Sequence, residues 1–337
     1  MYVKMRDGFK ITIMIRLKMD KKIALIVLFN HRYDKNLPIL EDIYKKRFSN
    51  RFYLVPFYDG DMENVIPVYG RSVFFEIYIA QAYNLLKNQG FDYYYIIADD
   101  MLINPIINEN NILEFFELQA GESWLPHLRR IRDQNKFWIG TLAAYTYKPV
   151  QKYVESKNEL PSIEEANRKF EMQGLYEPMK LDRKDVFREF SLRTTQMADK
   201  ARLALRIFTR LRHPFKKSAN LAYPLAASYS DTLLVSSESM PKFAHYCGVF
   251  GATSLFVEVA IPTALVLASG KRIKTEKDIS KSGRSYWKTS ENVFCDTPQF
   301  TWDCLEREYN NLDDMMARFP HDAIYLHPVK LSKWINK

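Results

Sequence analysis

The sequence is poor in cysteine, and this excludes two common ways of holding a small domain together. Only three cysteines occur in 337 residues, too few and too scattered for a disulfide framework or a zinc site: Cys247, Cys295 and Cys304. Such a chain fits a reducing compartment better than an oxidising one. We therefore expect a cytoplasmic protein whose thiols are ordinary structural residues.

The sequence also lacks the layout of a signal peptide and a convincing membrane span. Charged residues flank the short apolar run within residues 1–21, which we expect to form an N-terminal extension. Residues 247–268 are apolar, but Glu258 and Pro262 interrupt them. Because a carboxylate at mid-bilayer costs about 2.5–3.5 kcal/mol, we expect this stretch to be a buried part of a globular fold.

Positive charge is concentrated in one segment. The chain carries 49 Lys and Arg against 40 Asp and Glu, a net charge of +9. Residues 188–217 hold nine of the basic residues and two acidic ones, and so account for seven of the nine net charges. Arg202, Arg206 and Arg210 recur every four residues beside apolar neighbours, a pattern that suits an anionic membrane surface. No nucleic-acid-binding signature accompanies them. We expect a peripheral contact with the inner face of the membrane and no nucleic-acid partner; a solvated helix over the core is the alternative.

Apolar runs alternate with helix-period segments in the first third of the chain. KIALIVLF (22–29), RFYLVPFYDG (51–60) and FDYYYIIA (91–98) are typical of strands, and the first is continuous enough to be covered on both faces. Residues 36–48 and 72–89 between them have helical spacing. This order predicts an α/β fold that opens with a βαβ unit.

The pattern changes after residue 113. Residues 114–223 are mostly polar and helical in pattern, and we interpret them as an insert that includes the basic helix. Strand character returns at YSDTLLVSSES, helical segments follow, and DAIYLHPVKL is a last short strand. The predicted divisions are therefore 1–21, 22–113, 114–223 and 224–337.

Two adjacent aspartates, Asp99 and Asp100, end the strand at residues 91–98. Open parallel sheets bind ligands at the carboxyl ends of their strands. Two carboxylates this close repel one another unless a positive charge compensates, and hard oxygen ligands suit Mg²⁺ or Mn²⁺. A divalent cation that also holds substrate phosphate is therefore one hypothesis, and a turn with solvated acids is the other.

The stretch YYYIIADDMLINP resembles the DxD-type motif of GT-A glycosyltransferases, enzymes that transfer sugars from nucleotide donors. The resemblance implies a GT-A-like α/β fold, with a Rossmann-type mixed sheet flanked by helices and a mostly helical insert. SDTLLVSSESMPKFAHYCGVFGATSLFVEVAIPTAL resembles their acceptor half, and YLHPVKLS resembles the late segment that completes their metal site. The order and spacing of the three stretches carry the resemblance, which covers most of residues 22–331 with the insert poorly matched. It departs from the motif at Ala98, where the family more often has an acid.

The resemblance implies roles for the residues that match these stretches. Asp100 matches the direct metal ligand, and Asp99 matches the residue near the ribose or donor sugar. His327 matches the late histidine that completes the metal site, and Lys330 just beyond it is placed to pair with the diphosphate. Glu258 matches the carboxylate that deprotonates the acceptor hydroxyl in inverting members; a buried acid satisfied by an ordinary partner is the alternative.

Further donor-site candidates follow from the family's strand ends. Asn30 and His31 follow the first strand, where the nucleotide base and ribose bind in the family. Asp59 ends the second strand, in position to accept from a uracil N–H. Arg71 opens the helix before the aspartate pair, and its guanidinium matches phosphate geometry. For each of the four, an ordinary loop role is the alternative.

Together these features predict a glycosyltransferase that moves a hexosyl or pentosyl group from a nucleotide sugar to a glycan or lipid-linked acceptor, with Mn²⁺ or Mg²⁺ as cofactor. The family favours UDP-sugars, and the product would be a surface glycan such as lipopolysaccharide or capsule. A metal-dependent nucleotidyl- or phosphotransferase is an alternative, weakened because FNHRYDKN after the first strand has no glycine for a phosphate loop. A non-catalytic adaptor that uses the basic helix is another, and it would tolerate loss of the aspartate pair.

Overall fold

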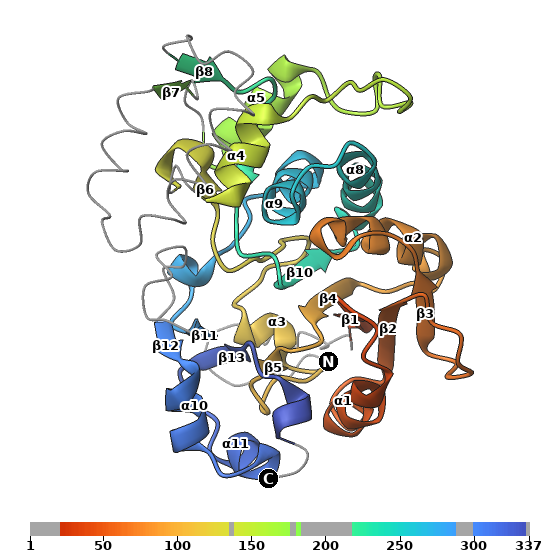
Figure 1. Ribbon diagram of the computed structural model, residues 1–337, viewed down its shortest axis with the longest axis vertical. Helices are drawn as coiled ribbons and strands as arrows, with labels where there is room; N and C mark the ends of the chain where they lie inside the picture. Colours follow the sequence, from red (N-terminus) through yellow and green to blue (C-terminus); the bar gives the residue numbers. More distant parts are fainter. Residues whose placement is uncertain (1–20, 135–137, 176–179, 183–217, 288–298, 335–337) are drawn as a thin grey trace, which may run out of the picture.

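The computed structural model describes residues 21–134, 138–175, 180–182, 218–287 and 299–334. Within them, the predicted α/β class is confirmed: a mixed sheet lies at the centre with helices on both faces (Figure 1). The N-terminal extension and the basic helix predicted within residues 188–217 lie outside the described residues.

The central sheet has the strand order β10-β4-β1-β2-β3. Its members are β1 (Ile23–Leu28), β2 (Asn50–Pro56), β3 (Val65–Val68), β4 (Tyr93–Ala98) and β10 (Thr232–Ser236). Strands β1 to β4 pair in parallel, whereas β10 runs antiparallel to β4, with Thr232 opposite Ile97. The start of β10 therefore lies at the same edge of the sheet as the carboxyl ends of β1 and β4.

Alternate residues of β1 enter separate cores on the two faces of this sheet. Ala24 and Ile26 pack with residues of α2 (Glu76–Leu86), α8 (Met240–Ala252) and α9 (Val257–Ala268). On the opposite face, Ile23, Leu25 and Val27 pack with α1 (Leu37–Tyr44) and the second sheet. Burial on both faces is the physical reason for the continuous apolar run of β1.

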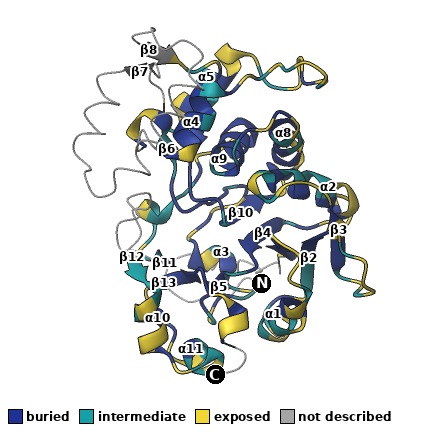
Figure 2. Cartoon of the chain, viewed as in Figure 1, coloured by how far each residue is buried: buried dark blue, intermediate teal, exposed yellow. Residues whose placement is uncertain are grey.

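The apolar stretch at residues 247–268 belongs to two helices. Helix α8 ends at Ala252, α9 begins at Val257, and every residue of α9 except Glu258 is buried (Figure 2). No helix in the described part of the chain is long and apolar enough to cross a membrane. The prediction that this stretch is buried within a globular fold is confirmed.

A second sheet of order β12-β11-β13-β5 brings the C-terminal segment to the central sheet. It consists of β5 (Leu102–Ile103), β11 (Ser282–Trp287), β12 (Gln299–Thr301) and β13 (Ala323–His327). Strand β5 begins two residues after the aspartate pair and runs antiparallel to β13, with Leu102 opposite Leu326. This pairing places the end of β13 beside the turn that ends β4.

The remaining elements are short. The helices are α3 (Ile112–Phe115), α4 (Ile139–Thr146), α5 (Ile163–Met172), α10 (Trp302–Glu308) and α11 (Leu312–Ala317). Two-stranded ladders join β6 (Arg129–Arg130) to β9 (Ala226–Ala227) and β7 (Lys180–Asp182) to β8 (Ser218–Asn220). Short 3-10 helices lie at Asp34–Asn36, Ser72–Phe74, Ile131–Asp133, Glu276–Asp278 and Leu331–Lys333.

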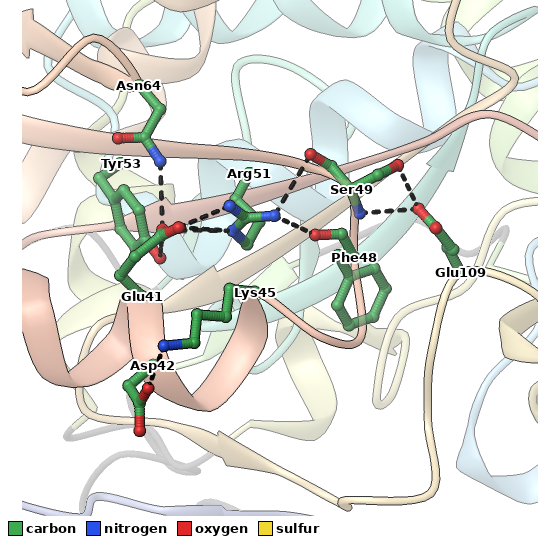
Figure 3. A network of polar contacts seen from close by, with 9 residues as sticks. All are labelled: Glu41, Asp42, Lys45, Phe48, Ser49, Arg51, Tyr53, Asn64 and Glu109. Carbon is green, nitrogen blue, oxygen red and sulfur yellow. Dashed lines mark hydrogen bonds and ion pairs between the residues drawn. The ribbon is translucent and has the colours of Figure 1, made fainter.

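A polar network fixes α1 against β2 (Figure 3). Glu41 of α1 accepts hydrogen bonds from Arg51 Nη2 at 2.5 Å, Tyr53 OH at 2.8 Å and Asn64 Nδ2 at 3.2 Å. Burial alone would raise the pKa of Glu41, but these donors stabilise the carboxylate and hold its pKa below the usual value. Because α1 follows β1 directly, this network also anchors the loop at residues 29–36 on the edge of the sheet.

Candidate active site

A cavity of about 1020 Å³ opens at the carboxyl edge of the central sheet. Its walls come from the loop after β1, the residues that precede α2, the turn after β4, the approach to β10, the start of α9 and the segment after β13. Ligand pockets commonly measure roughly 300–1,000 Å³, so this one has room for a large ligand. Six of the predicted site residues line it: Asn30, His31, Asp99, Asp100, Glu258 and Lys330.

The pairing of β5 with β13 brings His327 to Asp100, although 227 positions separate them in the chain. His327 Nε2 lies 2.9 Å from Asp100 Oδ1, and the Val329 amide donates to the Asp100 carbonyl at 2.6 Å. His327 is only 5% exposed. The two residues that the sequence analysis assigned to one cation therefore meet in the folded protein.

The metal-free aspartate pair divides its charge unequally. Burial alone would raise the pKa of Asp100 and lower that of His327, but each charge stabilises the other, so the pKa of Asp100 falls and that of His327 rises. Burial and the neighbouring Asp100 raise the pKa of Asp99 to about 8. Asp99 also accepts from Asn36 Nδ2 at 3.5 Å. At neutral pH, the negative charge of the pair therefore resides on Asp100.

Glu258 lies in the first turn of α9, at the point where this buried helix meets the cavity. Its side chain is half-buried, and the loss of hydration at the cavity wall raises its pKa to about 8, with a contribution from the nearby carboxyl group of Asp231. The Trp138 side chain donates a hydrogen bond to the carboxylate and opposes the shift. A carboxyl group with this pKa can accept a proton and release it near neutral pH.

The structure adds one carboxyl group that the sequence analysis did not single out. Asp231 precedes β10 and lines the cavity, and its backbone carbonyl accepts from the Ala98 amide at 2.8 Å. Burial raises its pKa, and the negative charge of Asp100 adds to the effect. The only signal in the sequence is an acid directly before an apolar strand, and its position at this edge depends on the antiparallel direction of β10.

The charges around His327 fit a divalent cation. Four carboxyl groups interact electrostatically with this one imidazole, namely those of Asp99, Asp100, Asp231 and Glu258. Added positive charge would reduce the repulsion among these carboxyl groups. Carboxylate oxygen and imidazole nitrogen are both acceptable ligands for first-row divalent metals.

The spacing of Asp100 and His327 also fits. Two ligand atoms that bind one cation at right angles, each about 2.1 Å from it, lie about 3 Å apart. The observed Oδ1–Nε2 distance is 2.9 Å. No group of three or more His, Cys, Asp or Glu side chains in the described residues is arranged to hold a metal ion. Asp100 and His327 would be two ligands, and water or phosphate oxygens would fill the other positions, as in many Mg²⁺ sites.

The other predicted cavity residues occupy its rim. Lys330 is exposed, its ammonium lies 4.7 Å from the centre of the Trp302 ring, and its charge helps to lower the pKa of Asp100. His31 meets Tyr33 edge to face, with ring centroids 5.7 Å apart. The backbone of Asn30 donates to Asp99. The mouth of the cavity therefore carries the Lys330 ammonium and the rings of His31 and Tyr33.

Asp59 and Arg71 lie apart from this group. Asp59 is exposed and forms an ion pair with Arg32, which itself lines the cavity. The Arg71 guanidinium lies 5.3 Å from the centre of the Phe74 ring. Neither residue contributes to the cavity lining. Their predicted contacts with base and phosphate remain predictions.

Comparisons with known proteins give little further information. No family model matches the chain, and no curated protein matches it by sequence. Among solved structures, it is similar to the mannosyltransferase Ktr4p from S. cerevisiae in complex with GDP, with a TM-score of 0.32 and 12% sequence identity. That similarity covers 77% of this chain and 70% of the other. A likeness at this level carries no weight in assigning function, which rests on the residues of the cavity.

Proposed function

We propose that this chain is a metal-dependent glycosyltransferase of the GT-A type. It would transfer a sugar from a nucleoside diphosphate donor, preferably a UDP-sugar, to a hydroxyl of a glycan or lipid-linked acceptor. One observation carries the proposal: Asp100 Oδ1 and His327 Nε2 meet at 2.9 Å, at the edge of a parallel sheet where ligands bind. The DxD-like stretch and the cavity around it support the same conclusion.

The donor side of the proposed site consists of six residues. Asp100 and His327 would hold the cation, and Lys330 would add a second positive charge from the rim. When bound, the cation supplies Lewis-acid stabilisation of the diphosphate leaving group. Asp99 would hydrogen-bond a ribose or sugar hydroxyl. Asn30 and His31 would border the ribose and base.

The acceptor side depends on Glu258. Its carboxylate would take the proton of the acceptor hydroxyl as that oxygen attacks the anomeric carbon and the bond from carbon to diphosphate breaks. A base with a pKa near the working pH is efficient in this role. Asp231 raises the proton affinity of Glu258 through its negative charge. The two carboxyl groups thus form one electrostatic unit on this side of the cavity.

The proposal of a lipid-linked acceptor comes from the sequence alone. Residues 188–217 carry seven of the nine net positive charges and would hold the enzyme at an anionic membrane surface, on its cytoplasmic side. Vesicles that contain anionic lipid should bind the full chain, and neutral vesicles should not. This part of the proposal is independent of the catalytic site.

A panel of UDP- and GDP-sugars tests the proposed activity. In the presence of Mn²⁺, one of them should stabilise the protein against heat and be slowly hydrolysed, and EDTA should abolish both effects. Because metal assistance supplies several kcal/mol, Asp100→Asn should lower the rate at least ~100-fold. Asp303→Asn, which changes an exposed acid of α10 outside the cavity lining, is the control and should behave as the parent. Full metal-dependent activity in Asp100→Asn would reject the assignment.

A further inference from the structure

The cavity has one apolar wall. Its apolar lining comes from two segments, Val73 and Phe75 before α2 and Phe256 and Val257 at the start of α9. Phe75 and Val257 are buried and belong to the core on that face of the sheet, whereas Phe256 is only partly buried. Phe256 is therefore the aromatic side chain that this wall offers to a ligand. Glu258 lies two residues further along the same helix start.

Phe256 is fixed at the N-terminus of α9. Its carbonyl accepts hydrogen bonds from the Val259 and Ala260 amides at 2.8 and 2.9 Å, so its backbone is part of the first turn of the helix. Its ring meets the Trp138 ring edge to face, with centroids 6.0 Å apart and planes 77° apart. Trp138 is buried, and its side chain also donates to Glu258. One buried indole therefore positions both the aromatic ring and the carboxyl group.

An aromatic ring beside a carboxyl group suits a pyranose sugar. Such a sugar has an apolar face of C–H groups and a rim of hydroxyls, and removal of apolar surface from water is favourable by about 25 cal/mol per Å². An ionised carboxyl group only accepts hydrogen bonds, so it pairs with the hydroxyls. A small aliphatic alcohol could use the carboxyl group of Glu258, but it would leave most of the Phe256 ring uncovered. The wall therefore favours a sugar ring over a simple alcohol.

We propose that Phe256 and Glu258 form an acceptor subsite for a pyranose ring, in which the apolar face of the sugar lies on Phe256 and the reacting hydroxyl meets Glu258. The inference rests on the proposed function and narrows its acceptor to a sugar hydroxyl. The hydroxyl oxygen bonds to the anomeric carbon of the donor, and its proton passes to the Glu258 carboxylate. The bond from that carbon to the diphosphate breaks, and the nucleoside diphosphate leaves with the electron pair. Phe256 forms none of these bonds and determines which acceptor is held.

Acceptor kinetics test the subsite directly. The methyl pyranosides of glucose, galactose and mannose, and glycerol as a non-sugar, are offered with Mn²⁺ and the nucleotide sugar identified by the panel above. At least one pyranoside should be glycosylated, and glycerol should be a much poorer acceptor. Phe256→Leu keeps an apolar side chain but removes the ring, so it should raise the KM for that pyranoside about 5–20-fold, with a smaller change in kcat. Phe256→Tyr keeps the ring and should stay within about twofold of the parent.

The donor side of the reaction supplies an internal control. The KM for the donor and its slow Mn²⁺-dependent hydrolysis without acceptor should be the same in the parent, Phe256→Leu and Phe256→Tyr. Phe57→Leu is the matched variant elsewhere: Phe57 is an exposed phenylalanine that meets Tyr69 edge to face and lies outside the cavity lining. Its KM for the pyranoside should remain within about twofold of the parent. If Phe256→Leu does not fold, Phe256→Met takes its place, because its flexible side chain fills irregular space without an aromatic ring.

A second measurement needs neither donor nor metal. In a saturation-transfer difference NMR spectrum of the full chain with the same methyl pyranosides, the C–H protons of one sugar face should receive the most magnetisation in the parent and in Phe57→Leu. This pattern should be lost in Phe256→Leu. The inference is overturned if Phe256→Leu matches the parent in both measurements, if no pyranoside is bound or glycosylated, or if glycerol is glycosylated as readily as the pyranosides. A parent that hydrolyses no nucleotide sugar but binds a pyranoside through Phe256 would instead reject the proposed function and leave the subsite standing.

Discussion

Two parts of the molecule bury acidic side chains, and they treat them differently. At the carboxyl edge of the central sheet, several carboxyl groups line one cavity and interact with His327. In the helical layer on one face of the sheet, Glu76 in the first turn of α2 is 0% exposed. Neither of its carboxyl oxygens has a hydrogen-bond partner in the described residues. The cavity gives its carboxyl groups a neighbouring positive charge and access to a ligand. The surroundings of Glu76 provide neither.

The comparison shows that burial of an acid is not by itself a sign of function. Burial raises the pKa of Glu76 well above its ordinary value, and it does the same to the Cys247 thiol, on which the charge of Glu76 also acts. At the cavity, burial also favours the neutral acid, but the imidazole keeps Asp100 charged. A functional carboxyl group needs a route to substrate and a partner for its charge, and only the cavity provides both.

The largest effect expected from this comparison is at Glu258. Glu258→Gln keeps the size of the side chain but removes the proton acceptor, so the rate of sugar transfer should fall about 10²–10⁴-fold. Mn²⁺ and donor binding should be unchanged, because Asp100 and His327 are intact. The parent rate should rise with pH up to about 8, where Glu258 loses its proton, and the residual rate of the variant should lack this rise. Rates measured from pH 6 to 9 check both statements, and a variant as fast as the parent would remove Glu258 from the mechanism.

The next largest effect is on stability, at Glu76. Its pKa in the folded protein is raised well above the unfolded value near 4.5, so the folded state binds more protons over the interval between them. Its contribution to stability is therefore fully present below pH 4.5 and is lost as pH rises through the folded pKa. Glu76→Leu should raise the free energy of unfolding at pH 8 by about 1–3 kcal/mol, since it removes a buried group without a partner. Urea unfolding between pH 5 and 8 measures this.

Two further variants sharpen the stability comparison. Glu76→Gln should flatten the decline in stability with pH, because the amide does not titrate. Glu41→Gln should destabilise the protein instead, since Glu41 is the carboxylate that accepts from Arg51, Tyr53 and Asn64. Sugar transfer should be unaffected by the changes at Glu76. If Glu76→Gln and Glu41→Gln destabilised the protein equally, hydrogen-bond partners would not explain how the two carboxyl groups differ.

The predicted part of this site came from strand ends, which the sequence marks clearly. The apolar run of β4 stops at Asp99, and the run of β13 stops at His327, so both residues could be placed at the edge of a sheet before the structure was known. Their meeting depends on β5, a strand of two residues, and on its pairing with β13. A strand this short has no periodicity that a sequence can show.

Other features could not be predicted for different physical reasons. Strand β3 spans four residues and contains Pro67, which disfavours a strand assignment. Asp231 was missed because the direction of β10 is set by packing against β4, not by its own residues. The contact between the Arg71 guanidinium and the Phe74 ring, 5.3 Å from its centre, is likewise a side-chain contact that no sequence pattern indicates, and the predicted phosphate contact of Arg71 stays a prediction. Local pattern fixes where a residue lies along an element, and long-range pairing and side-chain contacts decide what it faces.

The smallest predicted effect is on the KM for the donor, and it distinguishes Lys330 from Arg71 by what each side chain contacts. Lys330 lines the cavity and acts electrostatically on Asp100, whereas Arg71 does not line it. Lys330→Ala should raise the KM for the donor by about tenfold, equivalent to about 1.4 kcal/mol, with a smaller change in kcat. Arg71→Ala should change KM by less than about twofold, because its guanidinium is already engaged with Phe74. Initial rates over a range of donor concentrations give both values. If Arg71→Ala raised KM more than Lys330→Ala did, the Arg71 guanidinium would have to turn onto the diphosphate when the donor binds. The cavity would then take part of its phosphate contacts from a residue outside its present lining.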